Sequence, residues 1–447
     1  MGETYSRLAT NNPNVPFCVI SFYWDQLNVF NADEQLVGQI RSCIMYNWPK
    51  GIQKESRVSD VITFKLKGNP FWPQSSDHAQ FVHFACILLK ELSRSGYIKI
   101  MSSDVNWYCS LSAWFFYKSP TTVANDIEFC AIDMWGWDKL KFFNLPPAIN
   151  EAMKYVVFEN WKGVQQARVE DNIFTMKLKG FPWQNPGGED GVRNRLLIMK
   201  MIQVMANYGW TLYSATNIDA QTDTMFFCRK PNLYISPNFT QSMFAISLNL
   251  NDRLRLMNSN SQVVDIVRGV VTQFWSEIQG EQNHFGSHEF KLKGYPWYSR
   301  GERGLPSVTL LCQLFTALRR VGWKVIMNLD ISRSQTDKGV FFFINMPPKE
   351  TYYCAVGVKD SNHLYALHMH EQIHTYLSQL IPCFFDLKEP PLITYGGNAI
   401  RWTLQGTPWA VDGQSPAKYN GQLMLAALVN AMIGFNYHLC SAADITS

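Results

Sequence analysis

Hydrophobic and polar residues alternate with a period of two in several short segments of the chain. In FKLKG, residues 64–68, Phe64 and Leu66 alternate with lysines, and the pattern returns as MKLKG, FKLKG and WTLQG at residues 176–180, 290–294 and 402–406. Successive side chains of a β-strand point to opposite faces, so the pattern predicts four strands with hydrophobic residues inward and lysines outward. The glycines that end these segments recur about 112–114 residues apart, which indicates an internal repeat.

Other elements recur around these strands. The third repeat opens with MFAISL and RLRLM, residues 243–248 and 253–257, which predict a β-hairpin. Val263, Val267 and Val271 then follow one another at helical spacing, which predicts a helix with one core-facing side. A second helical stripe ends at a glycine in every repeat. Two more strand-like runs follow that glycine in the first three repeats.

This order of elements predicts an α+β fold of four tandem ββαβαββ modules, each of about 100–110 residues. In each module, two helices should cover one face of a mixed or antiparallel sheet. After an N-terminal leader of residues 1–16, the predicted modules span residues 17–119, 126–231, 241–348 and 351–447. The last module should lack its final strand, which would leave a neighbouring strand with an unpaired edge.

A Gly-x-Pro turn follows each repeated strand and brings an aromatic residue next to it. Glycine permits the sharp exit from the strand, and proline fixes the backbone of the turn. Trp183, Trp297 and Trp409 follow the proline directly, and Trp72 is displaced by one residue. We interpret these tryptophans as plugs that pack the corner onto the core, with a ligand-stacking platform as the alternative.

The outward-facing lysines of the repeated strands are candidates for contact with anions. They form three K-x-K pairs: Lys65 and Lys67, Lys177 and Lys179, and Lys291 and Lys293. Lysines beside an exposed aromatic ring are typical of single-strand nucleic-acid sites, where phosphates are neutralised and bases stack. The alternative is a solvated face that discourages edge pairing. The fourth module has Thr403 and Gln405 instead, so we expect nucleic acid to bind weakly at most.

Composition excludes further classes of protein. The chain has 47% hydrophobic residues for packed cores, and a net charge of +4 is too small for a dedicated nucleic-acid binder. The chain contains no run of about 18 uncharged apolar residues, so no transmembrane helix is predicted. The chain has ten cysteines, and several of them stand where other repeats have Phe or Met. We therefore expect buried thiols in a reducing, cytoplasmic compartment.

The segment HEQIH, residues 370–374, matches a zinc metalloprotease motif. In that motif His370 and His374 would bind zinc, and the intervening glutamate would activate water. The other modules lack the motif, the metzincin continuation is absent, and only Glu389 is a nearby acidic residue that could be a third ligand. We therefore expect no cofactor, and retain His370 and His374 as the metal-ligand candidates.

No complete catalytic site recurs in the four modules. The sequence therefore predicts a non-enzymatic intracellular scaffold that binds a protein partner or associates with itself. Two alternatives remain: a nucleic-acid or anionic-lipid binder that uses the K-x-K strands, and a zinc hydrolase confined to the fourth module.

Overall fold

The computed structural model describes residues 16–58, 60–73, 75–103, 111–119, 126–184, 187–218, 221–230, 242–299, 301–332, 337–410 and 415–443. These residues form eight α-helices and four sheets, in which neighbouring strands are antiparallel. The predicted α+β fold of repeated sheet-and-helix modules is confirmed. The predicted leader lies outside the described residues except for Pro16.

The first module sets the pattern for the next two. Its elements are β1 (Phe17–Tyr23), β2 (Gln26–Phe30), α2 (Glu34–Asn47), β3 (Ile52–Val58), β4 (Val61–Leu66), α3 (Ser76–Arg94), β5 (Tyr97–Ser103) and β6 (Ala113–Lys118). The strands form a six-stranded sheet in the order β3-β4-β2-β1-β6-β5. The first and last hairpins of the module therefore meet at the centre of the sheet, where β1 pairs with β6.

The second and third modules repeat this order and this sheet. The second comprises β7 (Glu128–Trp135), β8 (Lys139–Phe143), α4 (Pro147–Asn160), β9 (Val164–Glu170), β10 (Ile173–Leu178), α5 (Glu189–Asn207), β11 (Thr211–Asn217) and β12 (Asp223–Arg229). The third comprises β13 (Met243–Asn249), β14 (Arg253–Met257), α6 (Ser261–Phe274), β15 (Ile278–His284), β16 (Ser287–Leu292), η3 (Gly301–Gly304), α7 (Leu305–Arg320), β17 (Trp323–Leu329) and β18 (Asp337–Asn345).

The fourth module has a smaller sheet. It comprises β19 (Ala355–Lys359), β20 (His363–Leu367), α8 (Glu371–Leu380), η4 (Ile381–Cys383), β21 (Leu392–Thr394), η5 (Tyr395–Gly397), β22 (Ala399–Thr403) and α9 (Pro416–Gly434). Its four strands lie in the order β19-β20-β22-β21. The sequence predicted the loss of the last strand alone, but in the described residues after α9, up to 443, neither of the last two strands forms. Within the described chain β19 therefore pairs on one side only, with β20.

Each of the first three modules contains one strand more than the sequence predicted, and the fourth also contains one strand that the sequence analysis overlooked. The overlooked strands are β3, β9, β15 and β21, which directly follow the first helix region and pair with the repeated strand. Each lies at the edge of its sheet. Along β3 only Ile52 and Ser56 are even partly buried, and no residue is fully buried. A strand with so little buried surface carries no hydrophobic alternation, so pairing with its neighbour determines its structure.

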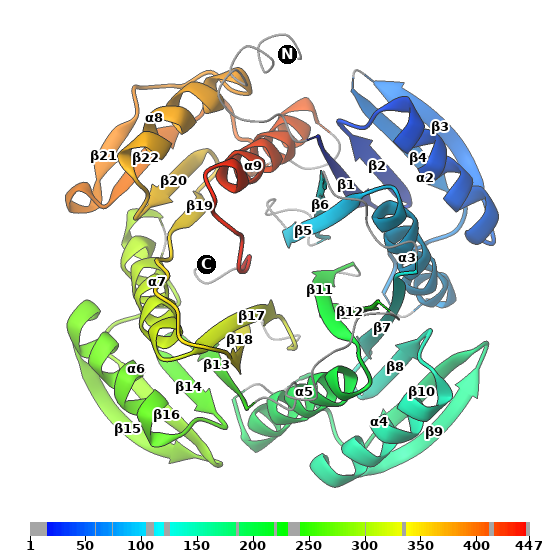
Figure 1. The fold of residues 1–447 in the computed structure, drawn as a ribbon, viewed down its shortest axis with the longest axis horizontal. Helices are drawn as coiled ribbons and strands as arrows, with labels where there is room; N and C mark the ends of the chain where they lie inside the picture. The colour runs from blue at the N-terminus through cyan, green and yellow to red at the C-terminus, as the bar shows by residue number, and fades with distance from the viewer. Residues whose placement is uncertain are drawn as a thin grey trace.

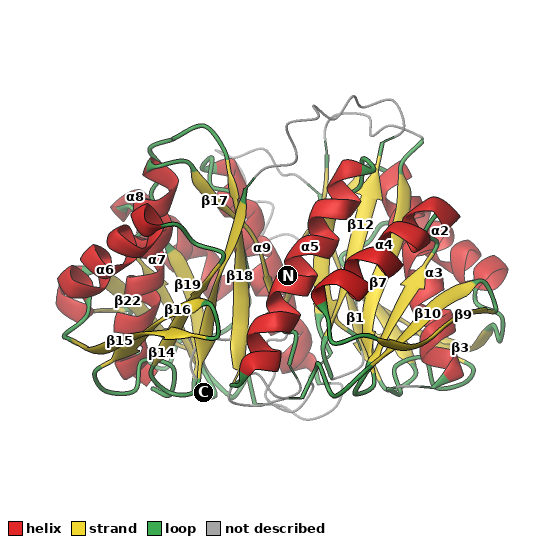
Figure 2. Ribbon diagram, turned by 90° about the horizontal axis from the view of Figure 1, so that it is seen from below, coloured by secondary structure: helices red, strands yellow, loops and turns green. Residues whose placement is uncertain are grey.

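The modules close into a ring because each second helix packs on two sheets (Figure 1). Helix α3 covers its own sheet and also contacts β7 of the second module, and α5 contacts β13 and β14 of the third. In the third module, Leu305 of α7 packs with Tyr365 and Leu367 of the fourth. Helix α9 then contacts β1 and β6 of the first module. The strands near the centre, such as β18, run roughly along the ring axis (Figure 2).

Ring closure explains why β1 is hydrophobic at almost every position. Cys18, Ile20 and Phe22 belong to the core beneath the module's own helices. Phe17 and Val19 point to the opposite face and belong to the core that includes α9. Both faces of this strand are therefore buried, and the alternation expected of a half-buried strand is absent.

Candidate functional site

The Gly-x-Pro turn forms a sharp corner at the end of the repeated strand in all four modules. Gly68, Gly180, Gly294 and Gly406 have φ angles between 77° and 91°, in the left-handed region that favours glycine. At Gly68 a Cβ atom would also lie 2.4 Å from Oδ2 of Asp77. Glycine is therefore required here for both its backbone conformation and its lack of a side chain.

The tryptophans after these prolines are buried inside the corner. Trp183 and Trp297 have no exposed surface, and Trp409 is 1% exposed. Each indole Nε1–H donates to the carbonyl oxygen of the first residue of the module's second strand, with distances of 3.1, 2.9 and 3.1 Å. These placements agree with a structural plug and leave no ring face for a ligand.

Trp72 does not have the role that the sequence analysis gave it. It is 63% exposed, whereas Phe71, the residue directly after the proline, is 5% exposed. The Phe71 ring lies 5.1 Å from the Phe22 ring and 4.7 Å from the Phe81 ring, so it fills the plug position. The smaller Phe ring occupies the place that Trp fills elsewhere, and Trp72 is left at the surface.

A set of exposed hydrophobic residues surrounds the corner in the first three modules. We call these residues the aromatic corners: Trp24 and Trp72; Trp137 and Phe181; and Leu250, Tyr295 and Tyr298. They are between 44% and 67% exposed. In the fourth module, Asp360 at the hairpin tip and Thr407 in the turn replace them. Apart from Trp72, the sequence analysis named none of these residues, because the residue that recurs directly after the proline is the buried one.

Each aromatic corner joins two segments that the sheet holds together. In the first module the amide of Leu66, at the end of the repeated strand, donates to the carbonyl of Asp25 in the first hairpin turn, at 2.8 Å. The second module repeats this bond between Leu178 and Asp138. The hairpin tip and the turn therefore lie side by side, and the rings of Trp137 and Phe181 are 6.3 Å apart in an edge-to-face arrangement.

The K-x-K lysines lie outward or partly outward, as the alternation predicts, but acidic residues neutralise several of them. Lys65 lies 3.6 Å from Asp25, and Lys177 lies 3.7 Å from Asp138. Lys293 pairs with Glu277 at 2.7 Å. Lys291 is partly buried, and Lys67 and Lys179 are exposed. The structure does not gather these lysines into one basic track, because each pair remains on its own module.

The histidines of HEQIH lie at the start of α8 without an assembled set of metal ligands. His370 is the residue that precedes the helix, and His374 lies within it. Burial lowers the pKa of His374, which favours the neutral ring. Glu389 instead pairs with Arg401 at 3.0 Å and accepts a hydrogen bond from Thr403 at 2.6 Å. Across the described ranges, no group of three or more His, Cys, Asp or Glu residues could hold a metal ion.

A buried lysine near the centre of the ring was not predicted. Strands β5, β11 and β17 line this region (Figure 1). Lys99 on β5 is 7% exposed and donates hydrogen bonds to the hydroxyl groups of Ser102 and Ser214. Its Nζ atom lies 5.4 Å from the centre of the Trp114 ring. Burial lowers the pKa of Lys99 to about 7, although the charge of Asp223 opposes this change.

We expect Lys99→Met to remove part of the pH dependence of stability. Lys99 has a lower pKa in the folded protein than in the unfolded chain, so between about pH 7 and 10 the unfolded chain binds the proton more readily. Lys99 therefore destabilises the wild-type fold by about 1.4 kcal/mol more for each unit that the pH falls within this range. Urea unfolding at several pH values should show that the free energy of unfolding changes less with pH in Lys99→Met than in the wild type.

The exposed Lys200 on α5 provides the control. Lys200→Met also removes a lysine, but from a surface position. Parallel pH profiles for wild type and Lys99→Met would contradict the assignment of a depressed pKa to Lys99.

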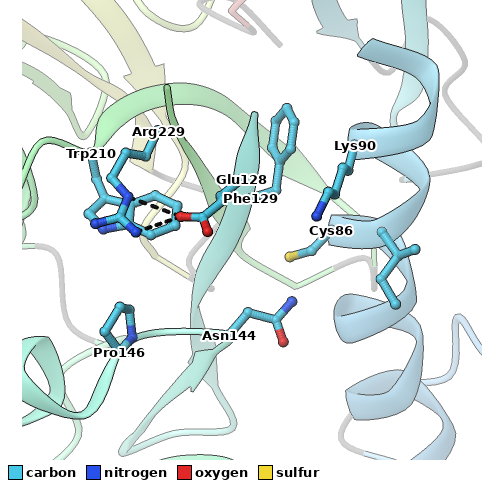
Figure 3. Close-up of a pocket in the computed structure, with 9 residues that line it drawn as sticks. Cys86, Lys90, Glu128, Phe129, Asn144, Pro146, Trp210 and Arg229 are labelled. Carbon is cyan, nitrogen blue, oxygen red and sulfur yellow. Dashed lines mark hydrogen bonds and ion pairs between the residues drawn. The ribbon is translucent and has the colours of Figure 1, made fainter. Parts of the chain in front are cut away.

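A pocket of about 280 Å³ lies between the first and second modules (Figure 3). Its lining residues are Cys86, Ile87 and Lys90 from α3, Glu128 and Phe129 from β7, Asn144 and Pro146 between β8 and α4, Trp210 before β11, and Arg229 from β12. Both Nε and Nη2 of Arg229 donate to Oε2 of Glu128, at 3.0 and 2.6 Å. Arg229 also lies 5.0 Å from the centre of the Trp210 ring. Burial raises the pKa of the Cys86 thiol, so it stays protonated.

Comparison with known proteins identifies the repeated unit as a shared domain. One domain-family model matches the chain three times, at residues 16–116, 128–228 and 242–344. These matches correspond to the three complete sheets. Among curated proteins and solved structures, none matches this chain. None of the described helices is both long and apolar enough to cross a membrane.

Proposed function

The chain belongs to the family defined by this repeated domain, and we propose that it is a non-enzymatic tandem-repeat scaffold that binds a protein partner through its aromatic corners. The observation that supports this proposal is the recurrence of exposed hydrophobic side chains at the same corner of the three complete modules. The buried plug beneath each corner supplies a rigid support.

Residue type and position both favour protein binding. Trp and Tyr are enriched among the residues that dominate binding energy at interfaces, because their rings bury a large area with few rotatable bonds. The modules follow one another around the ring (Figure 1), so the aromatic corner recurs from one module to the next. A partner that contacts two corners loses its translational and rotational freedom only once, so the second contact adds to the affinity without that cost.

Self-association is the other form of this proposal. Strand β19 pairs with β20 alone among the described strands, and its five residues are all partly exposed. An edge of this kind presents backbone donors and acceptors to which an extended strand can add. A second copy of the chain, or an extended segment of the partner, is the occupant that we propose for this edge.

The alternatives receive less support from the geometry. Acidic partners beside Lys65, Lys177 and Lys293 reduce the attraction of phosphates to the K-x-K strands. The zinc hydrolase lacks a third ligand near His370 and His374 among the described residues. An intracellular location remains part of the proposal, supported by thiols such as Cys18 and Cys130 that lie fully buried among hydrophobic residues.

We expect loss of the aromatic corners to weaken partner binding strongly without unfolding the protein. The test variant changes all seven corner residues to serine: Trp24→Ser, Trp72→Ser, Trp137→Ser, Phe181→Ser, Leu250→Ser, Tyr295→Ser and Tyr298→Ser. The control variant carries three substitutions of exposed aromatics on the outer helices α2 and α4: Tyr46→Ser, Tyr155→Ser and Phe158→Ser. Affinity purification from native extract should recover the same partners with wild type and control, and at least about tenfold less of them with the corner variant.

Sedimentation of the same three proteins separates the two forms of the proposal. A dimer that persists in the corner variant supports pairing through β19, and one that dissociates supports the corners. Equal partner recovery with all three proteins, together with monomers throughout, would contradict the scaffold proposal.

A further inference from the structure

The described residues after α9 take the place that β5 holds in the first module. In each complete module a glycine with a φ angle between 82° and 97° follows the second helix, and an aromatic residue comes next. In the fourth module Asn436 has a φ angle of 63° and precedes Tyr437. The amide of Tyr437 donates to a carbonyl oxygen in the last turn of α9 at 2.9 Å, as that of Trp210 does in α5. Residues 437–443 are therefore the counterpart of β5, β11 and β17.

The packing of these residues supports the same correspondence. Tyr437 lies with Cys354 against the hydrophobic core of the fourth module. Tyr97 and Cys18 lie together in the core of the first module in the same way. The carbonyl oxygen of Ala442 accepts a hydrogen bond at 3.5 Å from a side chain of β17 in the third module. The segment runs from α9 toward the centre of the ring, where β5, β11 and β17 also lie (Figure 1).

In each complete sheet one strand separates these two positions. Strand β6 lies between β1 and β5, β12 between β7 and β11, and β18 between β13 and β17. In the fourth module, β19 pairs with β20 alone among the described strands, and no described strand joins β19 to residues 437–443. We call the place beside β19 that corresponds to β6, β12 and β18 the open strand position.

Side chains of β19 are more exposed than their counterparts in the complete sheets. The registers of the first hairpins make Ala355 the counterpart of Val19, Ala131 and Ala245. Those three residues have no exposed surface, whereas Ala355 is partly exposed. The core against which Ala355 packs is small, and its buried residues are Leu305, Tyr365, Leu367 and Ala399. A further apolar side chain in the open strand position would enlarge this core.

Two consecutive phenylalanines occupy the corresponding place in every complete sheet. The residue opposite the counterpart of Ala355 is always a phenylalanine: Phe115, Phe226 or Phe342. The next residue, opposite the counterpart of Cys354, is also a phenylalanine: Phe116, Phe227 or Phe343. All six are at most 1% exposed. This place in the sheet therefore accommodates a buried aromatic ring on each face.

The two rings of each pair enter different cores. Phe226 packs in the core of the first module, and Phe227 packs in that of its own module. The pair in β18 divides in the same way between the second and third modules. In the fourth module, the corresponding cores are the small one around Leu305 at the junction with the third module and the one that includes Cys354 and Val356.

The backbone of β19 also directs hydrogen-bonding groups toward the open strand position. The amide of Lys118 in β6 donates to the carbonyl oxygen of Pro16 at 2.7 Å. Alternate residues of an antiparallel strand present their N–H and C=O groups to the same neighbour, so Cys18 also faces β6. Its counterpart Cys354, and Val356 two residues later, therefore face the open strand position. An extended strand that adds there can form hydrogen bonds with both.

We propose that the open strand position binds an extended segment of a partner protein that carries two consecutive phenylalanines and runs antiparallel to β19. The first ring packs at the junction with the third module, and the second packs in the core of the fourth. This inference rests on the proposed function, because it names the segment that the edge of β19 accepts. Another copy of the chain does not supply it: the described strands with consecutive phenylalanines, β6, β8, β12 and β18, are all paired on both sides.

The test uses the full chain and a fluorescein-labelled peptide with the sequence of residues 222–230, in which Cys228→Ser removes the thiol. This peptide contains the Phe-Phe pair of β12, and its charged residues Asp223, Arg229 and Lys230 favour solubility. Fluorescence polarisation should show saturable binding. Peptides with Phe226→Ala or Phe227→Ala should bind at least about tenfold more weakly, because each loses a buried aromatic anchor.

Hydrogen exchange locates the bound peptide. Exchange measured by mass spectrometry should slow in Ala355–Lys359 when the peptide binds, because amides of β19 gain hydrogen-bond partners. Binding without slower exchange in this strand would overturn the proposal. No binding at millimolar peptide, or equal binding of the two alanine peptides, would overturn it as well.

A matched pair of variants tests the backbone contact. Val356→Pro removes an N–H that faces the open strand position, a substitution that edge strands tolerate, and should weaken peptide binding about tenfold. Val356→Ala shortens the side chain but keeps the N–H, so it should bind at least about fivefold more tightly than Val356→Pro. Circular dichroism checks that both variants are folded.

The seven-serine variant of the aromatic corners separates this inference from the corner contacts. It should bind the peptide as wild type does, because β19 is unchanged. Peptide binding that is lost in the corner variant would assign the peptide to the corners and overturn the open strand position as its site. If the peptide fails to bind wild type, the recovery of partners through the corners is still tested by affinity purification.

Discussion

Trp297→Ala should lower the free energy of unfolding by about 3–5 kcal/mol, the usual cost of removing a fully buried large aromatic side chain. The indole has no exposed surface in the wild-type protein. Its loss leaves a cavity in the corner and leaves the carbonyl of Arg253 without its hydrogen bond. Trp72→Ala, at the 63% exposed position, should change stability by no more than about 0.5 kcal/mol.

Urea unfolding of the two variants measures this contrast directly. The paired comparison matters because the sequence places Trp72 and Trp297 in the same role. Equal losses of stability at both positions would contradict the structural plug, since they would imply that Trp72 is also buried.

Arg255→Met should destabilise the third module by about 3–5 kcal/mol, because it leaves the carboxylate of Glu289 buried without its main partner. The two side chains are 4% and 3% exposed, and Nε of Arg255 lies 2.6 Å from Oε2 of Glu289. Gln282 donates to the other carboxylate oxygen at 2.7 Å. In the double variant Arg255→Met/Glu289→Leu, no buried charge remains, and most of the lost stability should return.

The effect of Arg255→Met should also depend on pH. Burial alone would raise the pKa of Glu289, but hydrogen bonds from Arg255 and Gln282 outweigh it and hold the pKa below its usual value. In the wild type, this contribution to stability is present at neutral pH and is lost as the pH falls through the depressed pKa. Without Arg255, burial dominates and the carboxyl group takes up a proton at higher pH.

The difference in unfolding free energy between wild type and Arg255→Met should therefore narrow as the pH is lowered toward 4. Thermal or urea unfolding at a series of pH values gives this difference. A difference that stays constant with pH would mean that Glu289 is not the group responsible.

The sequence was sufficient to predict the repeat because the strongest patterns belong to buried surfaces. Phe64 and Leu66 alternate with lysines, and both are buried as expected. The edge strand β3 could not be predicted from the sequence, because none of its residues is fully buried and it therefore lacks a hydrophobic pattern. Its position depends on backbone pairing with β4, which leaves little trace in the choice of side chains.

The candidate site was predicted only in part. The turn glycines and the buried tryptophans follow from local backbone geometry, which a repeated motif records well. The exposure of Phe181 and Tyr295 depends on which side of the corner faces solvent, and the pocket depends on how two modules meet. Lys99 is buried because β5 lies near the centre of the ring. No pattern within one module contains that information.

Ring closure has a consequence for the order in which the chain folds during synthesis. Phe17, Val19 and Phe115 of the first module lie against helix α9, the last helix of the described chain. Chains emerge from the ribosome N-terminus first, at roughly 5–20 residues per second. The face of the first sheet opposite its own helices therefore stays exposed while the other modules are being made. It is covered only when residues 416–434 have emerged. A nascent chain thus presents an apolar surface that the finished ring conceals, so molecular chaperones that recognise such surfaces should bind the growing chain far more than the completed protein.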